Sequence, residues 1–216
     1  SFVQGSEPES EADGDVYVAY WFGGRTNVQR SADGGVTFGN PTYPFGVAFN
    51  VSDIRSSNPF TFRVNSYPNI ETDPTRPNYV YVVAADSGPG GVGRDQGDII
   101  FARSTNNGAT WGPTIILNTD GSGHLQVFPW MAVDNCGNIK VIWYDNRAGG
   151  MLLDVYESFS TDGGVVWSPN LRVTDVSFNP NTGQFAGNTF FGDYNGLGVS
   201  PNGKFHALWT DARTLE

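Results

Sequence analysis

Lysine and cysteine are scarce in this sequence of 216 residues, and long apolar segments are absent from it. Its one cysteine, Cys136, has no partner for a disulfide within the chain, and no cysteine–histidine spacing typical of a metal site occurs. No window of about 18 apolar residues exists, which excludes a membrane-spanning helix. The chain is nevertheless long enough to bury a hydrophobic core of its own.

Basic residues are also few, and only two of the twelve, Lys140 and Lys204, are lysines. Against them stand 22 acidic residues, 16 of them aspartates, so the formal net charge is −10. This balance excludes nucleic acid as a partner, because phosphate binding needs a basic face. A surface rich in aspartate and poor in lysine suggests a salt-adapted, halophilic source. Equal stability in low and in molar salt would contradict that hypothesis.

Turn-forming and aromatic residues are abundant instead. The chain contains 28 glycines, 13 prolines and 30 aromatic residues. Such a composition favours many short strands joined by tight turns over long helices. The sequence therefore predicts an all-β fold.

A turn followed by an apolar strand recurs four times along the chain. The predicted strands cover residues 16–22, 79–86, 139–145 and 204–211, and their last residues are 64, 59 and 66 positions apart. Asparagine, aspartate or glycine precedes each strand and can supply the positive φ of a tight hairpin. A further strand is expected before three of the turns, at residues 68–73, 129–134 and 194–200. Repetition of this kind indicates a repeat architecture.

A second motif, Ser-x-(Asp/Asn)-x-Gly-x-x-(Trp/Phe), follows three of these strands, at residues 31–38, 104–111 and 160–167. The Asp or Asn side chain can accept hydrogen bonds from backbone N–H groups across the turn, and the glycine can adopt a positive φ. The aromatic ring can then fold back as a plug. We expect Asp33, Asn106 and Asp162 to have this structural role.

This motif resembles the Asp-box, or BNR repeat, of sialidase-like propellers. Residues 128–134 with 143–147, and 192–197 with 209–213, are also similar to segments of bacterial BNR-repeat proteins. The resemblance covers most of the chain and implies a β-propeller of four-stranded antiparallel blades. Because Asp-boxes belong to the scaffold, the resemblance carries less weight for activity.

About three and a half blades are expected, in a single partial propeller over residues 1–216. The blades are predicted at about residues 1–60, 61–120 and 121–180, with an incomplete one at 181–216. Propellers close with four to eight blades. Either more chain therefore follows in the native protein, or a second copy completes the propeller as a homodimer.

Successive strands of a blade run in opposite directions, so each face of a propeller carries two kinds of loop. The resemblance implies that the active-site face holds the loops between second and third strands and the connections between blades. The residues expected there are Asp145, Arg147, Asp211, Arg213, Phe190, Phe191, Asp193 and Tyr194.

Each of these residues has a structural and a functional interpretation. The two Asp-x-Arg pairs either fix their loops or hold a ligand carboxylate with Arg147 and Arg213, since guanidinium groups suit carboxylates. Phe190 and Phe191 either pack between blades or form a platform for a sugar.

Catalysis would require further groups on the same face. Asp193 and Tyr194 either bond the backbone at a strand start or act as acid and nucleophile. His124 is either a solvated loop residue or a catalyst.

A calcium site is a weaker hypothesis, and no other cofactor is predicted. Oxygen ligands from Asp86, Asp95 and Asp98 would suit calcium, although the spacing of an EF-hand is absent.

The resemblance also raises a sialidase-like activity. Sialidases use three arginines, a tyrosine nucleophile with a glutamate partner, and an aspartate acid/base. The Arg-Ile-Pro motif of that family is absent here, and only Glu71 and Glu157 lie away from the termini, neither in a loop of the expected face. The catalytic set therefore cannot be transferred residue by residue.

The sequence thus predicts a sialidase-like propeller module that binds glycan or protein without demonstrated catalysis. The alternative is an exo-acting glycoside hydrolase whose full site needs further blades or a second chain. A third hypothesis is a structural segment of a larger propeller. Carbohydrate is the expected partner, and the expected location is extracellular or at the cell surface. Hydrolysis of a sialoside would select the enzyme, whereas saturable glycan binding without turnover would select the module.

Overall fold

A computed structural model describes residues 3–46, 60, 62, 64, 67–86, 97–121, 123–182 and 190–213. The helices and strands assigned in those ranges are thirteen β-strands and no helix. No helix in the described ranges is long and apolar enough to cross a membrane. The all-β prediction is therefore confirmed.

The strands form four separate antiparallel sheets, which we number as blades in chain order. Blade 1 contains β1 (Gln4–Ser10), β2 (Val16–Phe22) and β3 (Arg25–Ser31). Blade 2 contains β4 (Asn69–Thr72), β5 (Val80–Asp86), β6 (Asp98–Ser104) and β7 (Ile115–Ile116). Blade 3 contains β8 (Gln126–Val133), β9 (Ile139–Asp145), β10 (Asp154–Ser160) and β11 (Leu171–Arg172). Blade 4 contains β12 (Gly196–Val199) and β13 (Phe205–Leu208).

The predicted second strands agree closely with the observed ones in the first three blades. Strands β2 and β9 have the expected bounds, and β5 begins one residue later than expected. In blade 4 the strand ends at Leu208 rather than at Asp211. Blade 1 also departs from the four-stranded pattern, because its fourth strand is reduced to a single bridge between Val28 and Thr42.

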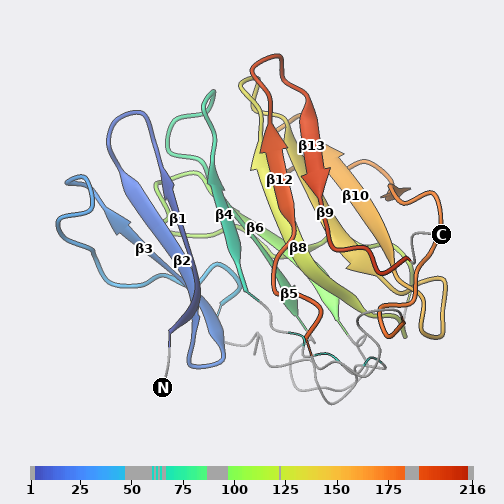
Figure 1. Ribbon diagram of the computed structural model, residues 1–216. Coiled ribbons are helices and arrows are strands. Elements are labelled where there is room, and N and C mark those ends of the chain that lie inside the picture. Colours follow the sequence, from blue (N-terminus) through green and yellow to red (C-terminus); the bar gives the residue numbers. More distant parts are fainter. Residues whose placement is uncertain are drawn as a thin grey trace.

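The first strand of each blade lies at one edge of its sheet, and these four strands stand side by side (Figure 1). We call β1, β4, β8 and β12 the inner strands. The later strands of each blade extend outward from this row (Figure 1). This arrangement is that of a partial β-propeller, as predicted.

The hydrophobic core lies between the blades. Alternate residues of each strand point to opposite faces of its sheet. Blades 2 and 3, which we call the inner blades, therefore each contribute to two interfaces, whereas blades 1 and 4 are the end blades. Tyr17 and Ala19 of β2 pack with Val80 and Val82 of β5 between blades 1 and 2. Opposite residues of β5, including Tyr81 and Val83, join a larger cluster with blades 3 and 4. That cluster contains Phe101, Ile139, Trp143, Val155 and Leu197 among others.

The turns between first and second strands lie beside the turn that follows the third strand of blade 3. Arg76, in the β4–β5 turn, donates from Nη1 to the carbonyl of Gly137 in the β8–β9 turn at 3.1 Å. Its Nη2 donates to the carbonyl of Thr161, after β10, at 3.3 Å. The opposite face carries the loops in which the site was predicted.

The motif at residues 31–38, 104–111 and 160–167 forms three turns with the same hydrogen bonds. In each, the serine hydroxyl donates to the Asp or Asn two residues on, over 2.6–2.9 Å at Asp33, Asn106 and Asp162. Each of these side chains accepts a backbone N–H from four residues on, at 2.8–3.0 Å. We call these segments the serine turns.

Candidate functional site

The inner strands form one continuous surface, and two of them are bulged at the same level. Strand β1 shifts its register against β2 around Gly5, and β8 shifts its register against β9 around Phe128. Both residues have positive φ angles, of 60° and 51° respectively. Phenylalanine rarely adopts this conformation, so the surrounding structure must hold it there. Bulges of this kind re-aim side chains and are frequent beside active sites.

Three aromatic side chains from different blades meet beside these bulges, and we call them the aromatic cluster. The rings of Tyr67, before β4, and Tyr194, before β12, stack with centroids 5.5 Å apart. Trp130 of β8 meets Tyr194 edge-on at 5.9 Å. The ring of Tyr67 also lies where a side chain on Gly5 would be, and its hydroxyl donates to Gln4 Oε1 at 3.2 Å. Tyr194 is 48% exposed, so the cluster is open to solvent.

Carboxylates follow the aromatic cluster along the inner strands. They belong to Glu7 and Glu9 of β1 and Glu71 of β4. Burial, followed by the negative charges of Glu9 and Glu7, raises the pKa of Glu71 to about 8. Burial also raises the pKa of Glu7 and of Glu9. Glu71 can therefore carry a proton at neutral pH, which is the property required of a general acid.

A pocket of about 400 Å³ opens at the far end of this surface, beside the β1–β2 and β4–β5 turns. Val133 of β8 closes one side of it. Its carboxylate-bearing wall residues are Glu9, Glu11, Asp13, Glu71 and Asp73. The inner surface is thus aromatic at one end and acidic at the other.

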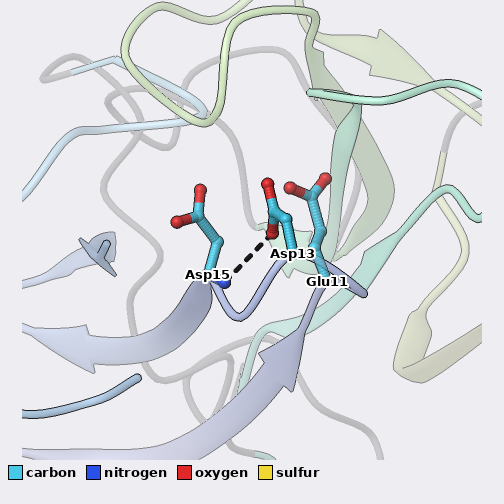
Figure 2. Close-up of side chains that lie close together, drawn as sticks. All are labelled: Glu11, Asp13 and Asp15. Carbon is cyan, nitrogen blue, oxygen red and sulfur yellow. Dashed lines mark hydrogen bonds between the residues drawn. The ribbon is translucent and has the colours of Figure 1, made fainter. Parts of the chain in front are cut away.

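Three carboxylates gather around the β1–β2 turn, at Glu11, Asp13 and Asp15 (Figure 2). One ligand oxygen from each lies within 4.8 Å of the others, which is the spacing of a cation site. Asp15 also donates its backbone N–H to Asp13 Oδ1 at 3.1 Å, as the dashed line in Figure 2 marks. Arg30 Nε donates to Asp15 Oδ2 at 2.6 Å and neutralises part of the charge. This ion pair engages Asp15 and leaves the carboxylates of Glu11 and Asp13 without a cationic partner of their own among the described residues.

The first predicted Asp-x-Arg pair is a buried ion pair within blade 3. Arg147 Nε and Nη2 donate to the two oxygens of Asp145 at 2.9 and 2.7 Å. The guanidinium carbon lies 3.9 Å from the centre of the Tyr156 ring, and Nη2 reaches Asn170 Oδ1 at 3.1 Å. Asp145 also accepts from Trp143 Nε1 at 3.0 Å. These neighbours fix the orientation of the guanidinium group.

The second pair lies at the surface, and the guanidinium group contacts only one oxygen of its aspartate. Arg213 Nε donates to Asp211 Oδ2 at 2.8 Å, and Nη1 donates to Asp175 Oδ1 at 2.5 Å. The Arg213 side chain remains 38% exposed. Asp175 lies in the connection between blades 3 and 4, so this pair links the two blades.

The residues of the last blade connection are divided between the core and the surface. Phe191 is buried, and its ring centroid lies 5.1 Å from that of Phe62 and 5.7 Å from that of Tyr144. Phe190 is exposed. Asp193 is partly buried, and Tyr194 belongs to the aromatic cluster. Among these predicted residues, the structure brings Tyr194 into the inner surface.

His124 lies in a polar network between blades 2 and 3. Its Nδ1 is 3.1 Å from Asp120 Oδ2, which also accepts from Gln126 Nε2 at 3.0 Å. Asn118 Nδ2 donates to Asp98 Oδ1 at 2.9 Å in the same network. Of the carboxylates suggested for calcium, Asp86 and Asp98 are buried opposite each other on β5 and β6. Asp95 lies outside the described residues.

Sequence reasoning missed Tyr67, Trp130 and Glu71 as site residues. The expected site residues came from the loops of the active-site face, which do not include Trp130 and Glu71. A comparison of the first strands with one another points to Tyr67, but not to Trp130 or Glu71. The turns that follow β4, β8 and β12 begin at Asp73, Asp134 and Ser200, and counting back from them puts Tyr67, Phe128 and Tyr194 at one level.

The overall fold matches those of carbohydrate-active β-propellers. An α-L-arabinofuranosidase mutant from Fusarium graminearum superposes with a TM-score of 0.61 and 14% identity, over 93% of this chain and 54% of that chain. An α-L-arabinanase from Penicillium chrysogenum, complexed with arabinobiose, superposes with a TM-score of 0.59 and 14% identity, over 94% and 56%. A Hadza microbial sialidase gives a TM-score of 0.53 and 17% identity, over 76% and 36%.

These matches confirm the resemblance to sialidase-like propellers at the level of the fold. The chain spans little more than half the length of the arabinofuranosidase and the arabinanase, and about a third of the sialidase. No protein-family model and no curated protein sequence matches the chain. Function must therefore be argued from the inner surface itself.

Proposed function

We propose that this chain is a carbohydrate-binding propeller module whose glycan site is the aromatic end of the inner surface. The observation that carries this proposal is the aromatic cluster of Tyr67, Trp130 and Tyr194. Aromatic rings cover the apolar faces of sugars, and polar groups beside them fix orientation through hydroxyl groups. The amide of Gln4, which meets Tyr67, supplies such a group.

The position of the cluster supports the proposal as well. Its three rings come from three blades, so a ligand there would contact three blades at once rather than one loop. The bulges at Gly5 and Phe128 shape the backbone at that place. The names of the structural neighbours, which are arabinan-degrading proteins and sialidases, agree with a glycan as the ligand.

Titration calorimetry with a panel of oligosaccharides tests the proposal. The panel contains arabinobiose, lactose and sialyllactose, so that neutral and anionic sugars are both covered. At least one should bind saturably, and Trp130→Ala should weaken it about tenfold, which corresponds to about 1.4 kcal/mol. Phe159→Ala is the matched control, since Phe159 is an exposed ring on β10, two strands away from the inner strand β8. Equal losses in both variants, or no binding by the wild type, would contradict the proposal.

The second candidate function is an exo-acting glycoside hydrolase of the sialidase-like kind. One observation favours it, namely the raised pKa of Glu71, because a glycosidase acid must hold its proton near neutral pH. Glu9 would be the second carboxyl group, as its negative charge already acts on Glu71. Asp193 and Tyr194, as acid and nucleophile, are the alternative to this carboxyl pair that the sequence predicts. A complete site of this kind needs further blades or a second chain.

Release of a chromogenic aglycone from aryl arabinofuranosides and aryl sialosides tests the hydrolase. If the activity exists and Glu71 is the acid, Glu71→Gln should reduce kcat by at least about a hundredfold. Binding of the sugars in the panel should survive this change. Turnover that Glu71→Gln leaves intact would exclude this role, and binding without turnover would leave the module.

The remaining expectations concern partners and location. The Asp145–Arg147 and Asp211–Arg213 pairs remain proposed ligand-binding residues for an anionic group on the loop face. Phe190, which is exposed, remains a proposed platform for a sugar, whereas Phe191 is buried among core rings. We place the protein outside the cell or at its surface, where glycans are accessible. A second copy of the chain is the protein partner that we consider next.

A further inference from the structure

The two end blades of the row present faces that the inner blades bury. In blade 2, Val80, Val82 and Ala84 point toward blade 1 and are fully buried. The corresponding residues of blade 1, counted from the start of β2, are Val16, Val18 and Tyr20, and Phe22 follows them. Phe22 is 40% exposed, and Val18 and Tyr20 are only partly covered. We call this the blade 1 end face.

The middle of the blade 1 end face is uncharged, and Arg25, the cross-strand partner of Phe22, lies at its margin. A shallow pocket of about 390 Å³ runs over it, lined by Val3, Ser6, Val18, Tyr20, Phe22, Gln29 and Phe38. None of these seven residues carries a charge, although the chain has a formal net charge of −10. An uncharged face of this kind fits an apolar protein surface better than it fits solvent.

Blade 4 presents the complementary face at the other end of the row. Its residues Phe205, Ala207 and Trp209 pack toward blade 3, so His206 and Leu208 point the other way. Leu208 is 75% exposed. Strand β5 ends at Asp86, and Asp211 follows β13. Counted back from these aspartates, His206 and Leu208 correspond to Tyr81 and Val83 of β5. In blade 2 those positions are the ones that pack against the next blade.

The chain therefore carries both halves of one kind of contact. Within it, the face with residues such as Tyr17 and Ala19 packs against the next blade's face with Val80 and Val82. His206 and Leu208 form a face equivalent to that of Tyr17 and Ala19. Val18 and Tyr20 belong to a face equivalent to that of Val80 and Val82. A surface that matches a different surface of the same molecule leads to head-to-tail association.

We propose that the blade 4 face of one copy docks on the blade 1 end face of a second copy. Leu208 and His206 then meet Val18, Tyr20 and Phe22 of the other chain, as Tyr17 and Ala19 meet Val80 and Val82 within the chain. The same contact places the second copy's β1 beside β12. It thereby extends the inner surface, with Gly5 of the other chain at the level of Tyr194, and Glu7 and Glu9 of the other chain further along β12, beside Gly196 and Gly198. The proposal goes beyond carbohydrate binding and does not depend on it.

Sedimentation of the whole chain, with two variants alone and mixed, tests this docking. The wild type should show a mass at least twice 23.4 kDa at about 100 μM, a concentration that detects micromolar affinity. Tyr20→Asp and Leu208→Asp should each sediment as a single chain, because each destroys one of the two different faces. An equimolar mixture of the two variants should associate again, since it retains one intact blade 1 face and one intact blade 4 face.

Controls separate this result from other forms of association. Val165→Asp adds the same charge at an exposed site on a serine turn and should leave the mass unchanged. Phe22→Ser and His206→Asp repeat the two tests at neighbouring positions if a first variant fails to fold by circular dichroism. A single-chain wild type would overturn the proposal. Loss of association in only one of the two variants, or no association in the mixture, would overturn it as well.

Discussion

Blades 3 and 1 carry the same serine turn, but only that of blade 3 is covered by a neighbour. Gly164 of blade 3 is buried, and an added side chain would come 2.6 Å from the ring of Phe101 in blade 2. Gly35 of blade 1 occupies the same place in its turn, has a similar φ of 88°, and has nothing within 4 Å of that point. The hydrogen bonds inside the two turns are nevertheless alike.

This difference indicates that hydrogen bonds within the motif are sufficient to form the turn. The contribution of the turn to the free energy of unfolding depends on its packing against the neighbouring blade. Trp167 of blade 3 packs edge-on against Phe101 at 4.9 Å, while its counterpart Phe38 in blade 1 is exposed. Repeated elements in the inner blades should therefore be sensitive to mutation, and their copies in the end blades should tolerate it.

The largest expected effect compares the two Asp-x-Arg pairs. Arg147→Ala in blade 3 should lower the free energy of unfolding by about 3–5 kcal/mol, because it leaves the buried Asp145 carboxylate without its counter-ion. Arg213→Ala in blade 4 should leave the stability unchanged within error, since that pair is solvent-exposed. Urea denaturation of both variants measures the difference. Similar losses would contradict the distinction between inner and end blades.

A pH effect of a few kcal/mol is expected from Glu71, which lies between blades 1 and 2. Its folded-state pKa of about 8 lies above the ordinary value of 4.5, so the folded protein binds the proton more tightly than the unfolded chain. This contribution is fully present below pH 4.5 and is lost as the pH rises through 8, at about 1.4 kcal/mol per unit of pKa difference.

Denaturation measured between pH 4.5 and 9 tests this effect with two glutamine substitutions. Glu71→Gln should remove most of the decline in stability, because it removes the ionisation. Glu157→Gln should keep the decline, as Glu157 lies on β10 in an ion pair with Lys140. A decline that persists unchanged in Glu71→Gln would assign it to other groups.

The serine turns themselves give a smaller and well-matched comparison. Gly164→Ala should destabilise the protein by about 2–3 kcal/mol, because it adds a clash with Phe101 to the strain of a side chain at positive φ. Gly35→Ala should cost only the backbone strain, about 1 kcal/mol. Thermal unfolding of the pair gives both values. Equal destabilisation would mean that the neighbouring blade contributes little to the turn.

The sequence allowed the local parts of this structure to be predicted. The serine turns depend on hydrogen bonds between residues at most four positions apart, so their residue types and spacing are sufficient. Strands β2 and β9 follow from their apolar residues and the turns before them. The fourth strand of blade 1 did not form as a ladder, and its remnant is the bridge from Val28 to Thr42.

The candidate site could not be predicted in the same way, because its residues are distant in sequence. Tyr67, Trp130 and Tyr194 follow one another at intervals of 63 and 64 residues and meet only because the inner strands stand in a row. The pKa of Glu71 likewise depends on Glu7 and Glu9, which reach it through the packing of β1 against β4. Neither property is visible in a local pattern.

The most direct test of the proposed glycan site is the change in tryptophan fluorescence on titration with the oligosaccharide that binds best. The wild type should give a saturable change, because Trp130 lies in the aromatic cluster. Trp130→Phe should lose most of that change while it keeps an aromatic ring and binds in calorimetry. A full fluorescence change in Trp130→Phe would place the ligand elsewhere and contradict the account.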